Sequence, residues 1–299
     1  MFHLKILAWA VFVSAGLLGQ SDAVKWNDLK ITFGVNVFSR YGFNRVERTK
    51  AEVASTQQWV PLFSESKCLN RIDDLEFHGF PMTEGRDKAV VTLYDKNGII
   101  AGIQAWMPHD EIITKKNIYR FDLSPMFQNA TLGGRKFFVL TAYFVQPDTI
   151  CTTGRDANSL DTDGTGNGLW FQNGPTPLDL IEVPLKRSKA IEKQWTKNNC
   201  FPAMGYHNFY NIPWVRENNC SVSRPAFLLY NGKDELHGFG FVVQGTATSK
   251  KFEHPPNLAV RLILGDAPSC TLEQNSLVGS TSLHVYFISR PQFIMCPIW

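Results

Sequence analysis

Segments in which apolar and polar residues alternate recur along this chain of 299 residues, and they constrain its fold more than any other feature. A period of two is typical of β-strands, and these segments are also rich in aromatic and β-branched residues. They cover 31–38, 89–94, 136–145, 227–230, 238–243 and 282–288. The turns at 95–98 and 231–232 suit tight hairpins between antiparallel strands. The best helix candidate, 48–58, carries only a weak apolar stripe. The pattern therefore predicts an all-β or β-dominated chain.

Two of these segments resemble each other at an offset of 136 residues, the difference between positions 230 and 94. At this offset Leu93, Tyr94, Gly102 and Trp59 correspond to Leu229, Tyr230, Gly238 and Trp195. Farther along, 139–151 and 260–270 each read as a strand that runs into a proline turn and then a cysteine. Hairpins of unrelated β proteins share turn residues and alternation, so such likeness also arises without common descent. The tryptophan-to-tyrosine spacing, which both segments keep, favours an internal duplication.

The duplication predicts two similar antiparallel β-sandwich-like lobes, at 24–185 and 186–299, that pack together. Each lobe is long enough to enclose a substantial core. No Gly/Ser-rich or Pro-repeat spacer separates them. Trp59 and Trp195 are expected to be buried, because a tryptophan kept in register in both copies is most simply a core anchor.

The first 23 residues have the order of a secretory signal peptide, with Lys5 in a short basic start, an apolar run over 6–18 and a small-residue end. We expect cleavage after Ala23, and a cut after Ser21 fits nearly as well. The apolar run is too short to span a bilayer, and no later stretch is long and apolar enough. The chain is therefore expected to be secreted and extracellular, without a membrane span. Its net charge of +3 and its short basic cluster at 186–189 predict no nucleic-acid partner.

All six cysteines follow the expected cleavage site: Cys68, Cys151, Cys200, Cys220, Cys270 and Cys296. An even number in an oxidising compartment predicts three disulfides. The duplication favours Cys68–Cys151 and Cys200–Cys270, which leaves Cys220–Cys296. The competing arrangement closes the short loop Cys200–Cys220 and leaves Cys270–Cys296.

Two sequons, which begin at Asn129 and Asn219, predict surface loops that carry glycan. The second is the weaker signal, because Cys220 stands at its centre and is expected in a disulfide.

The most loop-like stretch, 156–168, holds Asp161 and Asp163 at the spacing that opens a calcium loop, followed by a glycine. The match ends there, because position twelve is Gln172, which cannot supply the closing bidentate carboxylate. A plain acidic surface loop explains this stretch better, and weak calcium binding through Asp161 and Asp163 is the alternative.

A second candidate site follows Cys200, where His207 stands between Tyr206 and Tyr210 in an aromatic-rich segment. One imidazole and two phenols are the kind of sparse polar groups that orient a ligand in an apolar cleft. A disulfide-anchored core segment with a hydrogen-bonded His207 is the simpler interpretation.

The mature chain contains six histidines: His78, His109, His207, His237, His254 and His284. Two β lobes in a secreted chain of this length resemble the plan of copper-dependent monooxygenases, which hold metals with histidines from each lobe. The likeness is architectural only, because this chain has no His-His or His-x-His pair. A copper or zinc site would require histidines from separate strands to converge in space.

Catalytic motifs for hydrolases, nucleotide-binding enzymes and zinc proteases are missing from the sequence. We therefore expect a secreted, disulfide-bonded glycoprotein that acts as a non-enzymatic extracellular binding or matrix protein. Its partner would be a glycan, a mineral surface, a secreted protein or a small molecule. The alternative is a secreted oxidoreductase or oxygen-using enzyme, with or without a metal, that holds an apolar small-molecule substrate between the lobes.

Overall fold

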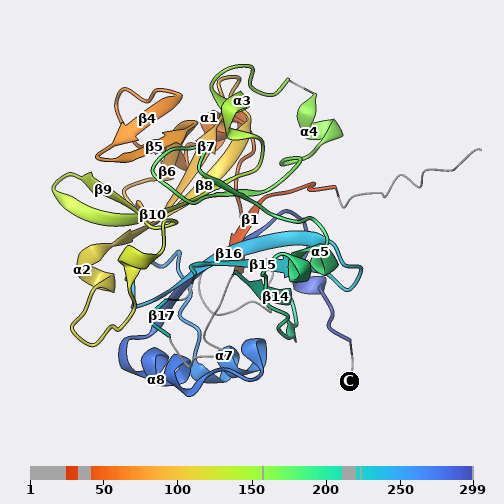
Figure 1. Cartoon of the computed structure of the whole chain (residues 1–299). Coiled ribbons are helices and arrows are strands. Elements are labelled where there is room, and N and C mark those ends of the chain that lie inside the picture. The colour runs from red at the N-terminus through yellow and green to blue at the C-terminus, as the bar shows by residue number, and fades with distance from the viewer. Residues whose placement is uncertain (1–24, 33–41, 157, 211–219, 223, 298–299) are drawn as a thin grey trace, which may run out of the picture.

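The computed structural model of the chain describes residues 25–32, 42–156, 158–210, 220–222 and 224–297. The expected signal peptide, 1–23, and the sequon residue Asn219 lie outside these ranges. Two antiparallel sheets stand one above the other, and helices α7 and α8 lie below the lower sheet (Figure 1). The prediction of a β-dominated chain is confirmed. Among the described residues, no helix is both long enough and apolar enough to cross a membrane.

Each sheet is built from strands that are distant in sequence. The upper sheet has the order β12 (Leu180–Glu182), β11 (Trp170–Gln172), β10 (Arg135–Tyr143), β8 (Ile100–Pro108), β7 (Val90–Tyr94), β6 (Phe80–Glu84) and β3 (Trp59–Pro61), and β9 (Gln128–Leu132) also pairs with β10. The lower sheet has the order β13 (Cys200–Phe201), β14 (Gly205–Phe209), β15 (Ala226–Tyr230), β16 (Leu236–Gln244), β17 (Ser280–Tyr286), β1 (Lys30–Thr32) and β2 (Phe43–Arg45). A separate hairpin consists of β4 (Leu69–Ile72) and β5 (Leu75–His78).

The helices are short and lie in the connections between strands. They are α1 (Lys50–Thr56), α2 (His109–Ile112), α3 (Pro147–Ile150), α4 (Ser159–Thr162), α5 (Arg187–Glu192), α7 (Asn257–Leu264) and α8 (Ser269–Val278), with single 3-10 turns at Phe121–Leu123 and Pro291–Phe293. Helix α1 lies within the segment that the sequence favoured. It begins with a capping box, in which Thr49 and Glu52 each bond the other's backbone N–H.

The two sheets share one core instead of enclosing one core each. Phe144, which follows β10, meets Phe239 of β16 at a ring-centroid distance of 6.1 Å, and Phe171 of β11 meets Phe241 at 5.7 Å. The same cluster of buried side chains contains residues of both sheets. The expected pair of sandwich-like lobes is therefore not confirmed, because residues of both sheets pack into one cluster between them.

Both faces of the central strands are buried. The hairpin β4–β5 and its neighbours cover the outer face of the upper sheet, where Leu75 and Phe77 pack against Leu93. Side chains of α7 pack against the outer face of the lower sheet beside Phe227. Every residue of β7, β8 and β15 is buried as a result, which explains why these strands are nearly continuous in apolar residues.

The hairpins β7–β8 and β15–β16 have the same register. Leu93 pairs with Gly102 in the first and Leu229 pairs with Gly238 in the second, and each ladder is interrupted directly after the leucine. A Cβ atom at Gly102 or at Gly238 would stand 2.6 Å from a carbonyl oxygen of the next strand. Both positions therefore require glycine because the neighbouring backbone approaches so closely.

The likeness ends at the expected third element. Residues 260–270 form the end of α7 and the start of α8, so the strand predicted there is wrong, and β17 takes the place beside β16. Apolar residues fill almost every position of α7, and such a run does not distinguish a strand from a helix by its periodicity. Trp59 and Trp195 are both buried, as expected.

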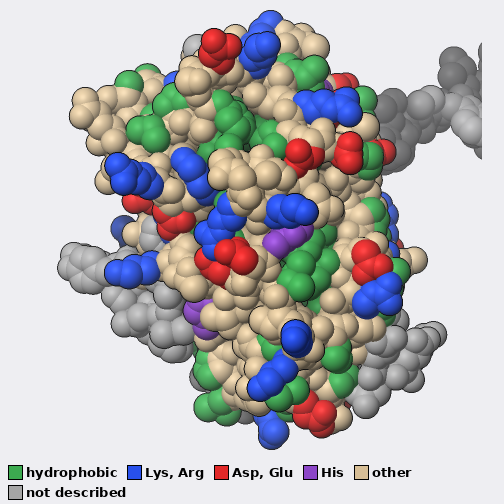
Figure 2. Space-filling view, turned by 90° about the vertical axis from the view of Figure 1, so that its left-hand side faces the viewer, with side chains coloured by type: hydrophobic (Ala, Val, Ile, Leu, Met, Phe, Trp, Pro, Cys, Tyr) green, Lys and Arg blue, Asp and Glu red, His purple; other side chains and the backbone are tan. Residues whose placement is uncertain are grey.

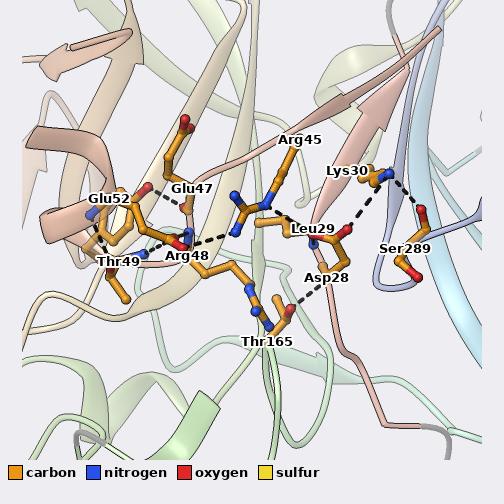
Figure 3. A network of polar contacts seen from close by, with 11 residues as sticks. Asp28, Leu29, Lys30, Arg45, Glu47, Arg48, Thr49, Glu52, Thr165 and Ser289 are labelled. Carbon is orange, nitrogen blue, oxygen red and sulfur yellow. Dashed lines mark hydrogen bonds and ion pairs between the residues drawn. The ribbon is translucent and has the colours of Figure 1, made fainter. Parts of the chain in front are cut away.

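The N-terminal segment belongs to the lower sheet, where β1 pairs with β17 on one side and β2 on the other. A network of polar contacts ties this segment to α1 and to the loop at 165 (Figure 3). The Lys30 ammonium donates to the carbonyl of Ser289 at 2.7 Å, and the Thr165 hydroxyl donates to the carbonyl of Asp28 at 2.7 Å. The network thus joins the first described strand to segments on both sides of the shared core.

Three disulfides are present: Cys68–Cys151, Cys200–Cys296 and Cys220–Cys270. The first is the expected pair, and both arrangements expected for the other four cysteines are wrong. The symmetric arrangement assumed that Cys270 closes a strand, whereas it lies in the first turn of α8. Its partner Cys220 is 6.0 Å away between Cα atoms, so this disulfide fastens α8 to the segment that precedes β15.

Candidate functional site

A cavity of about 330 Å³ lies between the outer face of the lower sheet and helix α7. Its volume falls in the range of small-molecule sites. Most of its wall is apolar, and the polar groups are few. The lining residues are Phe201, Met204, His207, Phe209, Arg224, Phe227, Val242, Val243, Gln244, Glu253, Pro255, Pro256, Ala259, Val260, Ile263, Leu264, Thr271, Ser280, Ser282 and His284.

Helix α7 forms the cover of this cavity. Pro255 and Pro256 precede the helix, and Pro256 is its N-cap residue, with an extended backbone. Val260 and Ile263 line the cavity, whereas Leu258 on the opposite side of the helix is 69% exposed. The sequence of α7 is apolar on both sides, and only one side faces the cavity.

The floor of the cavity depends on a glycine in β16. Gly240 pairs with Phe227 on one side and with His284 on the other. A Cβ atom at Gly240 would stand 2.1 Å from Cζ of Phe227, so the phenyl ring lies directly over the bare backbone. The ring thereby reaches His284, at a centroid distance of 4.8 Å. Because Gly240 has no side chain, Phe227 of β15 and His284 of β17 meet across β16.

Glu253 and His284 form a buried carboxylate–imidazole pair at one end of the cavity. The Glu253 carboxylate contacts Nδ1 of His284, and both side chains are almost fully buried. The backbone of Glu253 pairs with Ser282, which brings its carboxylate onto β17 two residues from His284. Burial and the neighbouring Glu253 charge hold the pKa of the Tyr286 phenol well above its usual value.

His207 faces the same cavity from β14. Its side chain is 1% exposed, and its ring lies 5.9 Å from that of His284 between centroids. The Nδ1 atom lies 3.2 Å from the carbonyl oxygen of Gly205. Burial, and then the nearby His284, hold the pKa of His207 well below its usual value, so the imidazole is neutral at neutral pH.

Two buried ring nitrogens in this site lack partners. Within the described part of the chain, neither Nε2 of His207 nor Nε2 of His284 has a hydrogen-bond partner, and Oε1 of Glu253 also has none. Buried polar atoms are normally hydrogen-bonded, and each exception calls for an explanation such as a bound ligand or water.

The structure separates the histidine predicted to bind a ligand from the two tyrosines beside it. Side chains alternate between the faces of a strand, so Tyr206 and Tyr210 pack toward the shared core while His207 faces the cavity. The Arg187 guanidinium lies 3.8 Å from the centre of the Tyr206 ring, and Tyr210 packs on Trp195. Tyr206 and Tyr210 therefore do not belong to the site.

The predicted calcium residues do not form a cluster. Asp161 lies in α4 and Asp163 follows it, and both are exposed. Gln172 lies buried in β11, where it accepts from the hydroxyl of Tyr143 at 2.8 Å. Within the described ranges, no three His, Cys, Asp or Glu side chains are grouped so that they could hold a metal ion.

The histidines divide into two sets. His207, His237 and His284 share the outer face of the lower sheet, where His237 and His284 both stack on Tyr286. The other three, His78, His109 and His254, lie in β5, in α2 and before α7. His237 is fully buried, and burial lowers its pKa to about 4.

The sequon residue Asn129 lies in β9, with an exposed side chain, so the predicted loop is a strand.

Sequence reasoning missed Glu253, His284 and the cavity itself. A signal for His284 existed in 282–288, where Leu283, Val285 and Phe287 form one apolar face and His284 and Tyr286 lie on the other. Aromatic and imidazole groups on the second face of a strand indicate a second covered surface. No sequence signal places Glu253 beside His284.

Comparison of the chain with models of known protein families, with curated proteins and with solved structures gives no match.

Proposed function

We propose that this chain is a secreted binding protein that holds an apolar small molecule in the cavity beneath α7. The observation that carries the proposal is a mostly apolar cavity of about 330 Å³ whose buried wall presents unpartnered polar atoms. Apolar walls with a few polar groups are the usual composition of small-molecule sites. The non-enzymatic binding role is the one that the sequence favoured. The apolar ligand comes from the alternative hypothesis, which had located it between two lobes and not beneath α7.

On the face drawn in Figure 2, charge gives no comparable support for a polyanionic partner. Figure 2 shows one face of the molecule, on which basic and acidic side chains of the described residues lie interspersed. A binding surface for a polyanion would be expected to gather basic groups on one side. The cavity is thus the better candidate for recognition.

The test is binding of the apolar fluorophore 1-aminoanthracene to the purified protein, measured by fluorescence titration. In Val260→Trp the new indole occupies the cavity, and we expect affinity to fall by about tenfold or more. Leu258→Trp is the matched control, because it adds the same side chain to the exposed side of α7. Equal affinity in both variants would place the fluorophore elsewhere and contradict the proposal.

Export is part of the same proposal. Three disulfides suit an oxidising compartment, and the exposed Asn129 side chain is accessible for glycosylation. Expression of the full chain in a secretory cell should release a protein that starts at Val24 and that loses mass on treatment with an N-glycosidase. A product that stays inside the cell with residues 1–23 attached would contradict export.

We also propose that the hairpins β7–β8 and β15–β16 descend from one unit. Their matching registers support this, and so do two equivalent bonds. The hydroxyl of Tyr94 donates to the carbonyl of Glu47 at 2.7 Å, and that of Tyr230 donates to the carbonyl of Pro184 at 2.6 Å. Shared descent would apply to these hairpins and to the segments that precede them. A superposition of the two hairpins in which Tyr94 and Tyr230 failed to coincide would contradict it.

A further inference from the structure

We infer that the ligand of the α7 cavity is an uncharged apolar alcohol or phenol, whose hydroxyl donates a hydrogen bond to Nε2 of His207. This inference rests on the proposed function and adds the chemical class of the ligand. It follows from the direction of the hydrogen bonds that are already made at the cavity wall.

The first step concerns the tautomer of His207. A carbonyl oxygen only accepts hydrogen bonds, so the contact between Nδ1 of His207 and the carbonyl of Gly205 at 3.2 Å places the proton on Nδ1. A neutral imidazole carries one proton, and Nε2 is then left with a lone pair. This buried nitrogen is an acceptor that lacks a donor in the described part of the protein.

The second step concerns the other polar atoms at this end of the cavity. The Glu253 carboxylate contacts Nδ1 of His284, its Oε1 atom is a further acceptor without a partner among the described residues, and Nε2 of His284 lacks a partner there too. A hydroxyl both donates and accepts, so one that donates to Nε2 of His207 still has an oxygen to offer Nε2 of His284. A carboxylate ligand would add a negative charge beside Glu253, and like charges in a buried site repel strongly. The wall therefore favours a neutral donor over an anion.

The third step concerns the remaining cation of the wall. Arg224 also lines the cavity, and its guanidinium donates to the carbonyl of Leu123 at 3.2 Å. It stands two residues before β15, at the opposite end of that strand from Leu229, the residue that pairs with His207. An acid that bound through Arg224 would leave Nε2 of His207 unsatisfied, which costs free energy in a buried site. A hydroxyl at His207 removes that cost.

The experiment compares three naphthalenes that share one apolar body. 2-Naphthol donates a hydrogen bond, 2-methoxynaphthalene only accepts, and 2-naphthoate is an anion. Dissociation constants for the folded full chain are measured by fluorescence titration at pH 7.5. We expect 2-naphthol to bind about fivefold more tightly than 2-methoxynaphthalene, because the ether leaves the buried Nε2 atom of His207 without a donor and this cost exceeds the gain from its extra methyl group. Naphthoate should bind most weakly.

A variant then locates the acceptor. In His207→Phe the ratio between the naphthol and ether constants should fall toward one, because the ring remains and the nitrogen is lost. Tyr206→Phe is the matched control on the same strand, and its ratio should stay at the wild-type value because Tyr206 faces the other way. The three-ligand ranking of the wild-type protein tests the inference independently, should His207→Phe fail to fold.

The outcomes separate the two proposals. Equal binding of naphthol and ether, or tightest binding of naphthoate, would overturn the inference about ligand class. The proposed function would remain intact in that case if Val260→Trp still blocks binding of all three ligands. A naphthol preference that His207→Phe leaves unchanged would also overturn it. Failure of all three to bind the wild-type protein would contradict the proposed function itself.

Discussion

Glu253 and His284 contact each other through carboxylate and imidazole while both side chains remain about 95% withdrawn from solvent. Glu253 comes from the connection before α7 and His284 from the middle of β17, so the pair links the cover of the cavity to its floor. A polar pair at such depth contributes little net stability, because the loss of hydration of its two groups offsets their attraction. Removal of one partner alone is costly, so substitution of His284 tests whether the pair is present.

Substitution His284→Ala should lower the free energy of unfolding by about 3–5 kcal/mol, because it leaves the buried Glu253 charge without its partner. Urea unfolding followed by tryptophan fluorescence measures the change. The control is Lys189→Ala, which breaks an ion pair with Glu192 whose two side chains are both more than half exposed. That change should cost less than about 0.5 kcal/mol. Equal effects of the two substitutions would show that Glu253 is not buried against His284.

Stability should decline as the pH falls from about 6.5 toward 4. His237 has its pKa lowered from 6.5 to about 4 by burial, so the unfolded chain binds its proton more readily than the folded protein does. The stability contribution is complete above the unfolded pKa and disappears as the pH approaches the folded value. The shift corresponds to roughly 3 kcal/mol for this residue, and the lowered pKa of His207 acts in the same direction.

Chemical denaturation at several pH values measures this loss, with His237→Phe as the comparison. The variant keeps an aromatic ring at the site and has no group to protonate there. Its stability should therefore depend less steeply on pH over this interval. Parallel curves for the two proteins would contradict the assignment to His237.

Gly238→Ala should destabilise the protein by about 2 kcal/mol, because the added methyl group would stand 2.6 Å from the carbonyl oxygen of Val285. Gly102→Ala should have a similar effect, since Ala142 presents its carbonyl at the same distance. Gly232→Ala is the control, because a Cβ atom there meets open space. Thermal unfolding of the three variants measures the difference. A stable Gly238→Ala protein would show that β17 does not approach β16 so closely.

Peptide mapping without reduction should recover the three pairs Cys68–Cys151, Cys200–Cys296 and Cys220–Cys270. Removal of the third pair by Cys220→Ser and Cys270→Ser should cost about 4 kcal/mol, as expected for a closed loop with a sequence separation of 50 residues. It should also weaken ligand binding, because α8 contributes Thr271 to the cavity wall. Recovery of a Cys200–Cys270 peptide would contradict this arrangement.

Local sequence patterns determined the strands and the hairpins of this protein. The aromatic and β-branched residues over 89–94 and 238–243 and the turn residues at 95–98 and 231–232 predicted β7, β16 and their hairpins, because strand preference and turn conformation depend on a few adjacent residues. His207 was also recognised as a candidate from its aromatic neighbours. Its grouping with Tyr206 was wrong, since adjacent residues of a strand point to opposite faces.

The tertiary structure alone decided which side chains from distant segments contact each other. Glu253 reaches His284 because the connection before α7 pairs with β17, and the Phe227 ring reaches His284 because Gly240 between them has no side chain. The partners of Cys220 and Cys200 likewise depend on where α8 and the C-terminal segment dock. Strand order, the docking of a helix on a sheet and the pairing of distant cysteines arise from contacts between remote segments, and no local period in the sequence encodes them.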